Sequence, residues 1–183
     1  MVLHAQHWLT LGAVAIAALA AISDYRTGLI PNRLVGFGFL ALFVLRVAAA
    51  LLGDPSQLAT SLGLLGLGML ISALIPLTLY ICRALGAGDV KLMAVCGAGL
   101  GPVAGLEAEF YAFGFGALYA LAHSAYSGVL LATLRGSALL LTNPLIPRRL
   151  RKPVPVVAQK PMRFGPAICA GVIAAAFLHW SAP

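Results

Sequence analysis

Residues 58–82 have the sequence LATSLGLLGLGMLISALIPLTLYIC, and this uninterrupted apolar stretch decides the class of fold. It contains no charged side chain and is longer than the ~20 residues that a helix needs to cross the hydrocarbon core of a bilayer. The whole chain of 183 residues is 61% hydrophobic and only 9% charged. Soluble domains carry about 25% charged residues. The sequence therefore predicts an all-α, polytopic membrane protein.

Apolar runs of similar length recur along the chain and predict a bundle of about six transmembrane helices. One such bundle uses the full length, so residues 1–183 are expected to form a single transmembrane domain with no soluble domain beside it. The predicted spans are 7–23, 34–52, 58–82, 90–106, 109–134 and 164–181.

The distribution of Lys and Arg predicts the orientation of these spans. All Lys and Arg residues except Arg46 fall in connections that alternate with non-basic ones, and the positive-inside rule assigns the basic side to the cytoplasm. Both termini are then expected outside. The largest basic connection, 135–163, is rich in proline and is expected to be a cytoplasmic loop. Arg46 lies inside the second predicted span, where it either snorkels to the outer interface or pairs with an intramembrane group.

Two aspartates lie at the edges of apolar runs, where a charge is expensive. Asp24 follows the first predicted span, and Asp89 precedes the fourth. An ionisable group at membrane depth is by default a candidate functional residue. The chain crosses the membrane out and back between them, so both are predicted at the same cytoplasmic rim. They are therefore candidate catalytic partners.

Asp89 ends the sequence Gly86-Ala87-Gly88-Asp89 at a predicted helix start. Glycine permits unusual backbone angles and close approach by another chain. We therefore expect Gly86 and Gly88 to give a substrate backbone access to Asp89. Small residues at 97, 101 and 105 are also expected to let helix backbones approach closely in lipid.

Several other functions are not supported by the sequence. The net charge of +7 is spread over connections between spans, with no basic arm or aromatic platform, so no nucleic-acid partner is expected. The four histidines have no ligand spacing, and Cys82, Cys96 and Cys169 form no CxxC pair, so neither a metal nor another cofactor is expected.

Three stretches, in order, resemble the type 4 prepilin peptidases, which are intramembrane aspartic peptidases of the GxGD kind. They are Asp24 followed by IPNRL at 30–34, then GAGDVKLM at 86–93, then RFGPA at 163–167. The resemblance covers nearly the whole chain and implies that Asp24 and Asp89 match the two catalytic aspartates of the family. It further implies cleavage of the basic leader from prepilin-like or pseudopilin-like precursors, at the cytoplasmic face of the bacterial inner membrane.

The resemblance is to the short, peptidase-only form associated with tight-adherence (Flp-type) pili, since few residues precede the first predicted span. Longer members add an amino-terminal cytoplasmic region and also N-methylate the new amino terminus. Methyl transfer is therefore not expected of this chain. The expected partners are a prepilin or pseudopilin helix and the lipid bilayer.

The expected mechanism is hydrolysis by two carboxyl groups that share one proton. An argument from helix dipoles makes Asp89, near a helix start, the base, and Asp24, near a helix end, the acid. Two alternatives remain open at this point. Paired intramembrane carboxyls also serve proton-coupled transporters, and a non-catalytic pilus or secretion assembly scaffold would use the aspartates only to cap or pair.

Overall fold

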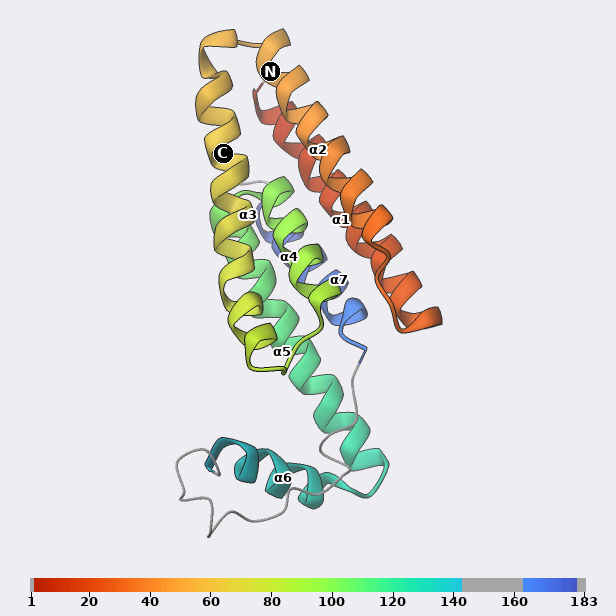
Figure 1. Ribbon diagram of the computed structural model, residues 1–183. Coiled ribbons are helices and arrows are strands. Elements are labelled where there is room, and N and C mark those ends of the chain that lie inside the picture. The colour runs from red at the N-terminus through yellow and green to blue at the C-terminus, as the bar shows by residue number, and fades with distance from the viewer. Residues whose placement is uncertain (1, 143–162, 181–183) are drawn as a thin grey trace. The chain divides into compact units, whose positions relative to one another are not determined.

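The computed structural model describes residues 2–142 and 163–180 and shows helices throughout these ranges (Figure 1). The predicted all-α class is confirmed. The helices are α1 (Val2–Thr27), α2 (Asn32–Leu52), the short 3₁₀ helix η1 (Pro55–Gln57), α3 (Leu58–Ile81), α4 (Ala87–Leu100), α5 (Pro102–Tyr126), α6 (Leu130–Thr142) and α7 (Gly165–Leu178).

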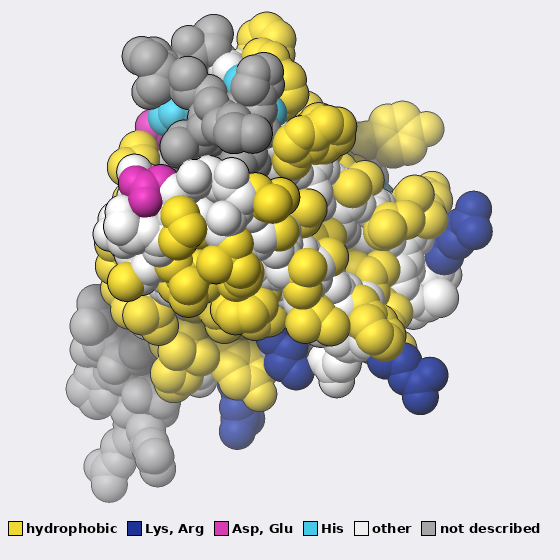
Figure 2. All heavy atoms as spheres, turned by 90° about the horizontal axis from the view of Figure 1, so that it is seen from above, with side chains coloured by type: hydrophobic (Ala, Val, Ile, Leu, Met, Phe, Trp, Pro, Cys, Tyr) yellow, Lys and Arg dark blue, Asp and Glu magenta, His cyan; other side chains and the backbone are white. Residues whose placement is uncertain are grey.

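Three of the described helical stretches are long and apolar enough to cross a membrane. They are Gln6–Thr27, Asn32–Leu52 and Pro55–Ile81. Large apolar side chains such as Phe37, Leu70 and Leu74 are more than half exposed on these helices. Figure 2 shows hydrophobic side chains over most of the visible face, with Lys and Arg at its edges. A surface this apolar requires lipid, which confirms the membrane protein class.

The chain divides into two compact parts. The first contains Met1–Gly116 and Arg163–Pro183, and the second contains Ala117–Met162. In the first part α1 packs against α2, α4 and α7, and α3 packs along α4. Its most completely buried large aliphatic side chains come from four different helices: Leu9, Leu42, Leu92, Ile168 and Val172.

Glycine allows the closest approach of two helices within this first part. A Cβ atom placed on Gly68 of α3 would overlap the carbonyl oxygen of Gly97 in α4. A Cβ on Gly97 would in turn overlap the side chain of Ser72, whose hydroxyl is buried. Such backbone contact is how helices associate where lipid removes the hydrophobic driving force. The structure confirms the expected close approach at Gly97.

The boundary predicted between the fourth and fifth spans is wrong. The predicted span 90–106 is broken at Gly101, whose φ of +88° ends α4, and Pro102 starts α5. Proline is favoured at the first helical position because its missing N–H is not needed there. The small residues 97, 101 and 105 therefore lie on two helices. Glu109, which the sequence places at the first residue of the predicted span 109–134, lies well inside α5 and is only 2% exposed.

The predicted span 109–134 also differs from the structure. Residues 127–129 form a turn around Gly128, whose φ is +68°, and they separate α5 from α6. Because α6 continues to Thr142, the first part of the expected loop 135–163 is helical. Residues 143–162 of that loop lie outside the described residues.

The contact between α3 and α4 predicts opposite effects for two neighbouring glycines. Gly68→Ala should destabilise the protein by about 1–3 kcal/mol, because the new methyl group overlaps backbone that cannot move aside. Gly66→Ala is the matched control, since a Cβ there meets nothing within 4 Å. It should be neutral or stabilise by up to ~1 kcal/mol through helix propensity. Thermal unfolding in detergent would check both, and equal melting temperatures would contradict the contact.

Candidate functional site

Asp24 lies in the last turn of α1 and is buried, with only 6% of its surface exposed. The helix ends just beyond it: Gly28, with φ of +70°, donates its N–H to the Asp24 carbonyl at 2.8 Å. A residue in this left-handed conformation is a common helix terminator. The sequence therefore holds Asp24 at the very end of a span.

The carboxyl group of Asp24 faces the start of α7. The backbone N–H of Gly165 donates to Asp24 Oδ2 at 2.8 Å. A Cβ atom on Gly165 would lie 2.8 Å from Asp24 Cβ, so only glycine lets α7 begin this close to the carboxyl. The unpaired N–H groups at a helix start suit an anion. No role for Gly165 was predicted from the sequence, although this residue opens the last span beside Pro166.

Asp89 lies in the first turn of α4, which begins after Gly86. Its carboxylate reaches back to the backbone of Gly86 in a hydrogen bond, the arrangement of an acidic residue at the third helical position. A Cβ on Gly86 would lie 3.0 Å from Asp89 Oδ2. A Cβ on Gly88 would lie 3.1 Å from the Cβ of Ile30. Both glycines therefore already have packing roles within the chain.

Asp24 lies near enough to Asp89 for its charge to act on the Asp89 carboxyl group. Asp89 lies outside the three candidate spans, and two effects raise its pKa to about 6: burial, which is the larger, and the charge of Asp24. The hydrogen bond with Gly86 acts in the opposite direction. A charge perturbs its neighbour in this way only over a short range, since salt and solvent screen distant charges.

Basic and polar side chains connect the helix ends around this pair. Lys91 Nζ donates to Asn32 Oδ1 at 2.9 Å, which joins α4 to the start of α2. The Arg163 guanidinium donates to the carbonyl of Tyr25 and lies 5.9 Å from the centre of the Tyr25 ring. These contacts fix the four helix ends that position the two aspartates. The sequence analysis missed both contacts, because they join residues 59 and 138 positions apart.

Other titratable groups lie away from the pair. Glu109 is buried, and neither of its carboxyl oxygens has a hydrogen-bond partner among the described residues. His179 pairs with Glu107 at 2.7 Å. Within residues 2–142 and 163–180, no three His, Cys, Asp or Glu side chains gather in a way that could hold a metal ion. The site consists of two carboxyl groups, backbone N–H groups and surrounding cations.

Comparison with known proteins shows the family of this chain. The profile of the type IV leader peptidase family matches residues 11–121, which include both aspartates. The chain belongs to the type IV leader peptidase family. The prepilin leader peptidase/N-methyltransferase of Bacillus subtilis (strain 168) is 32% identical over 164 residues. That match covers 88% of this chain and 52% of the relative, so the chain spans about half of the relative's length. No solved structure matches the chain.

The hydrogen bond from Gly165 predicts that Asp24→Ala and Asp24→Asn differ in stability. Both substitutions remove the same charge, but asparagine keeps an oxygen that can accept from Gly165, whereas alanine leaves this N–H buried and unpaired. The alanine variant should therefore be less stable than the asparagine variant by about 1–3 kcal/mol. Thermal unfolding in detergent measures the difference, and two equally stable variants would show that this hydrogen bond contributes nothing.

Proposed function

We propose that this chain is an intramembrane aspartic endopeptidase that removes the basic leader peptide from prepilin-like or pseudopilin-like precursors. Membership of the leader peptidase family supports the reaction class. The observation that carries the proposal is the proximity of two acids: Asp24, at the end of α1, bonds the start of α7, and its charge acts on Asp89 at the start of α4. Two interacting carboxyl groups share a proton and titrate as a pair.

The environments of the two aspartates favour a division of labour. Asp24 accepts a hydrogen bond from the start of α7, which suits a carboxylate, so we assign it as the base. Asp89 keeps its proton to a higher pH than a free aspartate, because burial and its neighbour raise its pKa to about 6, so we assign it as the acid. This order is the reverse of the one expected from the dipoles of α1 and α4 alone, because that argument omitted α7.

In the proposed reaction, a water molecule between the carboxyl groups gives a proton to Asp24 and attacks the scissile carbonyl carbon. Asp89 donates its proton to the carbonyl oxygen, which gives a neutral tetrahedral intermediate. Asp89, now ionised, takes the proton back as the carbonyl re-forms and the C–N bond breaks. The departing amine receives the proton that Asp24 took from water, so both residues return to their initial states.

We place this site at the cytoplasmic face of the inner membrane, with both chain termini outside. The support is the cluster of cations beside the pair: Arg26, Arg33, Lys91 and Arg163 all lie at the helix ends that carry the aspartates. The positive-inside rule assigns such an end to the cytoplasm. An extended substrate backbone would approach Asp89 beside Gly86 and Gly88, and it would have to displace the Ile30 side chain that packs against Gly88.

Asparagine substitutions test the proposed pair. Asp24→Asn and Asp89→Asn should each lower the rate of leader cleavage by about 10²–10⁴-fold, the range of a lost general acid or base. The assay uses purified protein in detergent with a single-span precursor that has a short basic leader ending in glycine. Glu107→Gln is the matched control, because this half-exposed carboxylate lies away from the pair and should keep full activity.

Two results would contradict the proposal. Cleavage that survives in both asparagine variants would exclude the aspartate pair as the catalytic machinery. A precursor left intact by the unmodified chain, but cut by a competent peptidase in the same detergent, would favour a transporter or an assembly scaffold.

The assignment of Asp89 as the acid predicts a falling rate at alkaline pH. Above the pKa of Asp89, about 6, the proton needed by the scissile carbonyl is lost, so log kcat/KM should decline with rising pH. Bound substrate and lipid exclude water further, so the decline should start at or above this value. A pH series with the Glu107→Gln control would measure it. A rate that stays constant up to roughly pH 9 would contradict the assignment.

A further inference from the structure

Arg46 is a half-buried cation in α2 that the proposed reaction does not use. Its Nη1 donates to Gln6 Oε1 at 2.8 Å, and its Nε donates to the Ser61 carbonyl at 3.2 Å. Among the described residues, one ion pair is present, between His179 and Glu107. Arg46 therefore has no carboxylate partner within this part of the chain. A guanidinium has five N–H donors, and only two of these bonds are made.

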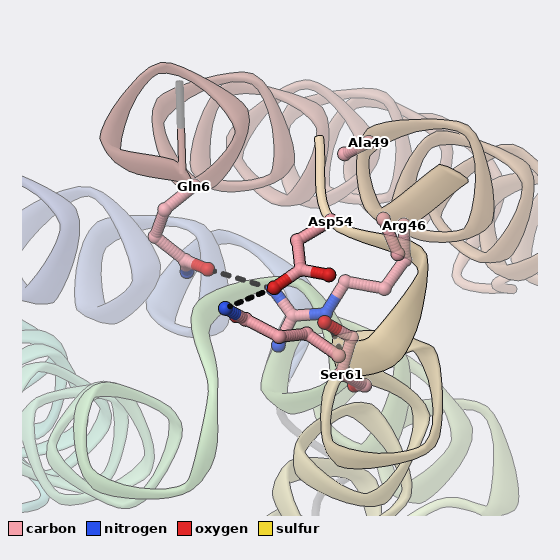
Figure 3. A pocket seen from close by; sticks show the side chains of 7 residues that line it. Gln6, Arg46, Ala49, Asp54 and Ser61 are labelled. Atoms are coloured by element: carbon pink, nitrogen blue, oxygen red, sulfur yellow. Dashed lines mark hydrogen bonds between the residues drawn. The ribbon is translucent and has the colours of Figure 1, made fainter. Parts of the chain in front are cut away.

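The Arg46 side chain borders a cavity of about 60 Å³ (Figure 3). Its polar lining consists of Gln6, Arg46, Asp54, Gln57 and Ser61, with two alanines of α2 beside them. Figure 3 shows Gln6, Arg46 and Asp54 pointing toward the same space from α1, α2 and the connection after α2. This volume has room for several water molecules or for one tetrahedral oxyanion.

Asp54 contributes the opposite charge to the cavity wall, and it is held by its own neighbours. Its Oδ1 accepts from the backbone N and the hydroxyl of Ser56, at 3.0 and 2.7 Å, and its Oδ2 accepts from Gln57 Nε2 at 3.2 Å. Hydrogen bonds from Ser56 lower the pKa of Asp54, which keeps this exposed group ionised. The cavity thus has a cation and an anion on separate walls that do not pair.

The position of the cavity matches the headgroup layer of a bilayer. Asp54 lies in the connection between two candidate spans, Asn32–Leu52 and Pro55–Ile81, where the hydrocarbon ends. Arg46 is less than two turns before the end of α2, about 9 Å along the helix axis. Its long side chain can therefore reach the level at which lipid phosphates lie.

We propose that this cavity binds the phosphate of a phosphoethanolamine group on the Arg46 guanidinium, while the primary ammonium lies at the rim on the exposed Asp54 carboxylate. The guanidinium fork suits phosphate oxygens, which accept two parallel N–H bonds. Asp54 Oδ2 accepts one bond within the chain and has a lone pair free for an ammonium N–H. Choline has no N–H to donate, and glycerol carries no positive charge. The site therefore selects ethanolamine.

The binding test uses delipidated full-length protein in detergent. Native mass spectrometry and the shift in melting temperature are recorded against dioleoyl phosphatidylethanolamine, phosphatidylcholine and phosphatidylglycerol. The ethanolamine lipid should bind at least about tenfold more tightly than the other two, a difference of ~1.4 kcal/mol. Soluble phosphoethanolamine is a separate arm: binding of this compound without binding of the lipid would assign the same chemistry to a soluble ligand.

Two substitutions connect the binding to these residues. Asp54→Asn, in an exposed connection, should reduce the affinity for the ethanolamine lipid about tenfold while leaving phosphatidylglycerol unchanged. Arg46→Gln should lower the affinity for both the ethanolamine lipid and phosphatidylglycerol. If the glutamine variant does not fold, Arg46→Lys replaces it, because lysine keeps the charge but lacks the guanidinium fork. Arg33→Gln and Glu107→Gln are matched controls at other positions. Equal binding of the three lipids, or unchanged selectivity in Asp54→Asn, would overturn the proposal and leave Arg46 as a link between α1, α2 and α3.

Discussion

The placement of one buried and one half-buried carboxyl group, Asp24 and Asp89, at one end of a helix bundle is the constraint on which the functional part of this structure depends. Two neighbouring carboxyl groups raise the free energy of the folded chain, because their negative charges repel each other and because they lose part of their hydration. The bundle offsets this cost with backbone donors: Gly165 at the start of α7 bonds Asp24, and Gly86 at the start of α4 bonds Asp89. Both helices also direct the positive ends of their dipoles at the pair.

This arrangement explains why glycines surround the site. A helix start can serve a carboxyl only when its backbone comes within hydrogen-bond distance, and a Cβ at Gly165 would occupy the place of Asp24 itself. The neighbouring cations do not bond to the aspartates themselves. Lys91 and Arg163 bond to Asn32 and Tyr25 rather than to the aspartates, so they join helix ends without neutralising the acids. Within the described residues, the two carboxyl groups are therefore left without a bonded cation.

The sequence predicted the class of fold and the candidate pair because both depend on local signals. Apolar runs such as 58–82 predict spans by length alone, and counting crossings predicts that Asp24 and Asp89 lie on one side. The boundary at Gly101 was missed because hydropathy does not change there, although Gly-Pro is a recognised signal for a break. With that boundary misplaced, Glu109 was placed at the edge of a predicted span, and its burial inside α5 could not be foreseen.

Contacts between distant residues were beyond the reach of the sequence. Gly165 and Asp24 are 141 positions apart, and no local pattern indicates that one donates to the other. The same holds for Arg46, where the sequence left snorkelling and pairing as alternatives. The structure contains elements of both alternatives. Two N–H donors of the Arg46 guanidinium bond to Gln6 and Ser61, and the rest of the guanidinium borders the cavity beside Asp54.

The two polar sites lie at opposite ends of the same helices, and the packing between them relates one to the other. α1 carries Gln6 near its start and Asp24 near its end, while Gln6 also donates to the carbonyls of Gly99 and Leu100 at the end of α4. Between the sites, α3 and α4 touch backbone to backbone at Gly68 and Gly97. Packed interiors transmit displacement because they have little free volume. A change at the Arg46 end can therefore reach the helix starts that position the aspartates only by moving whole helices.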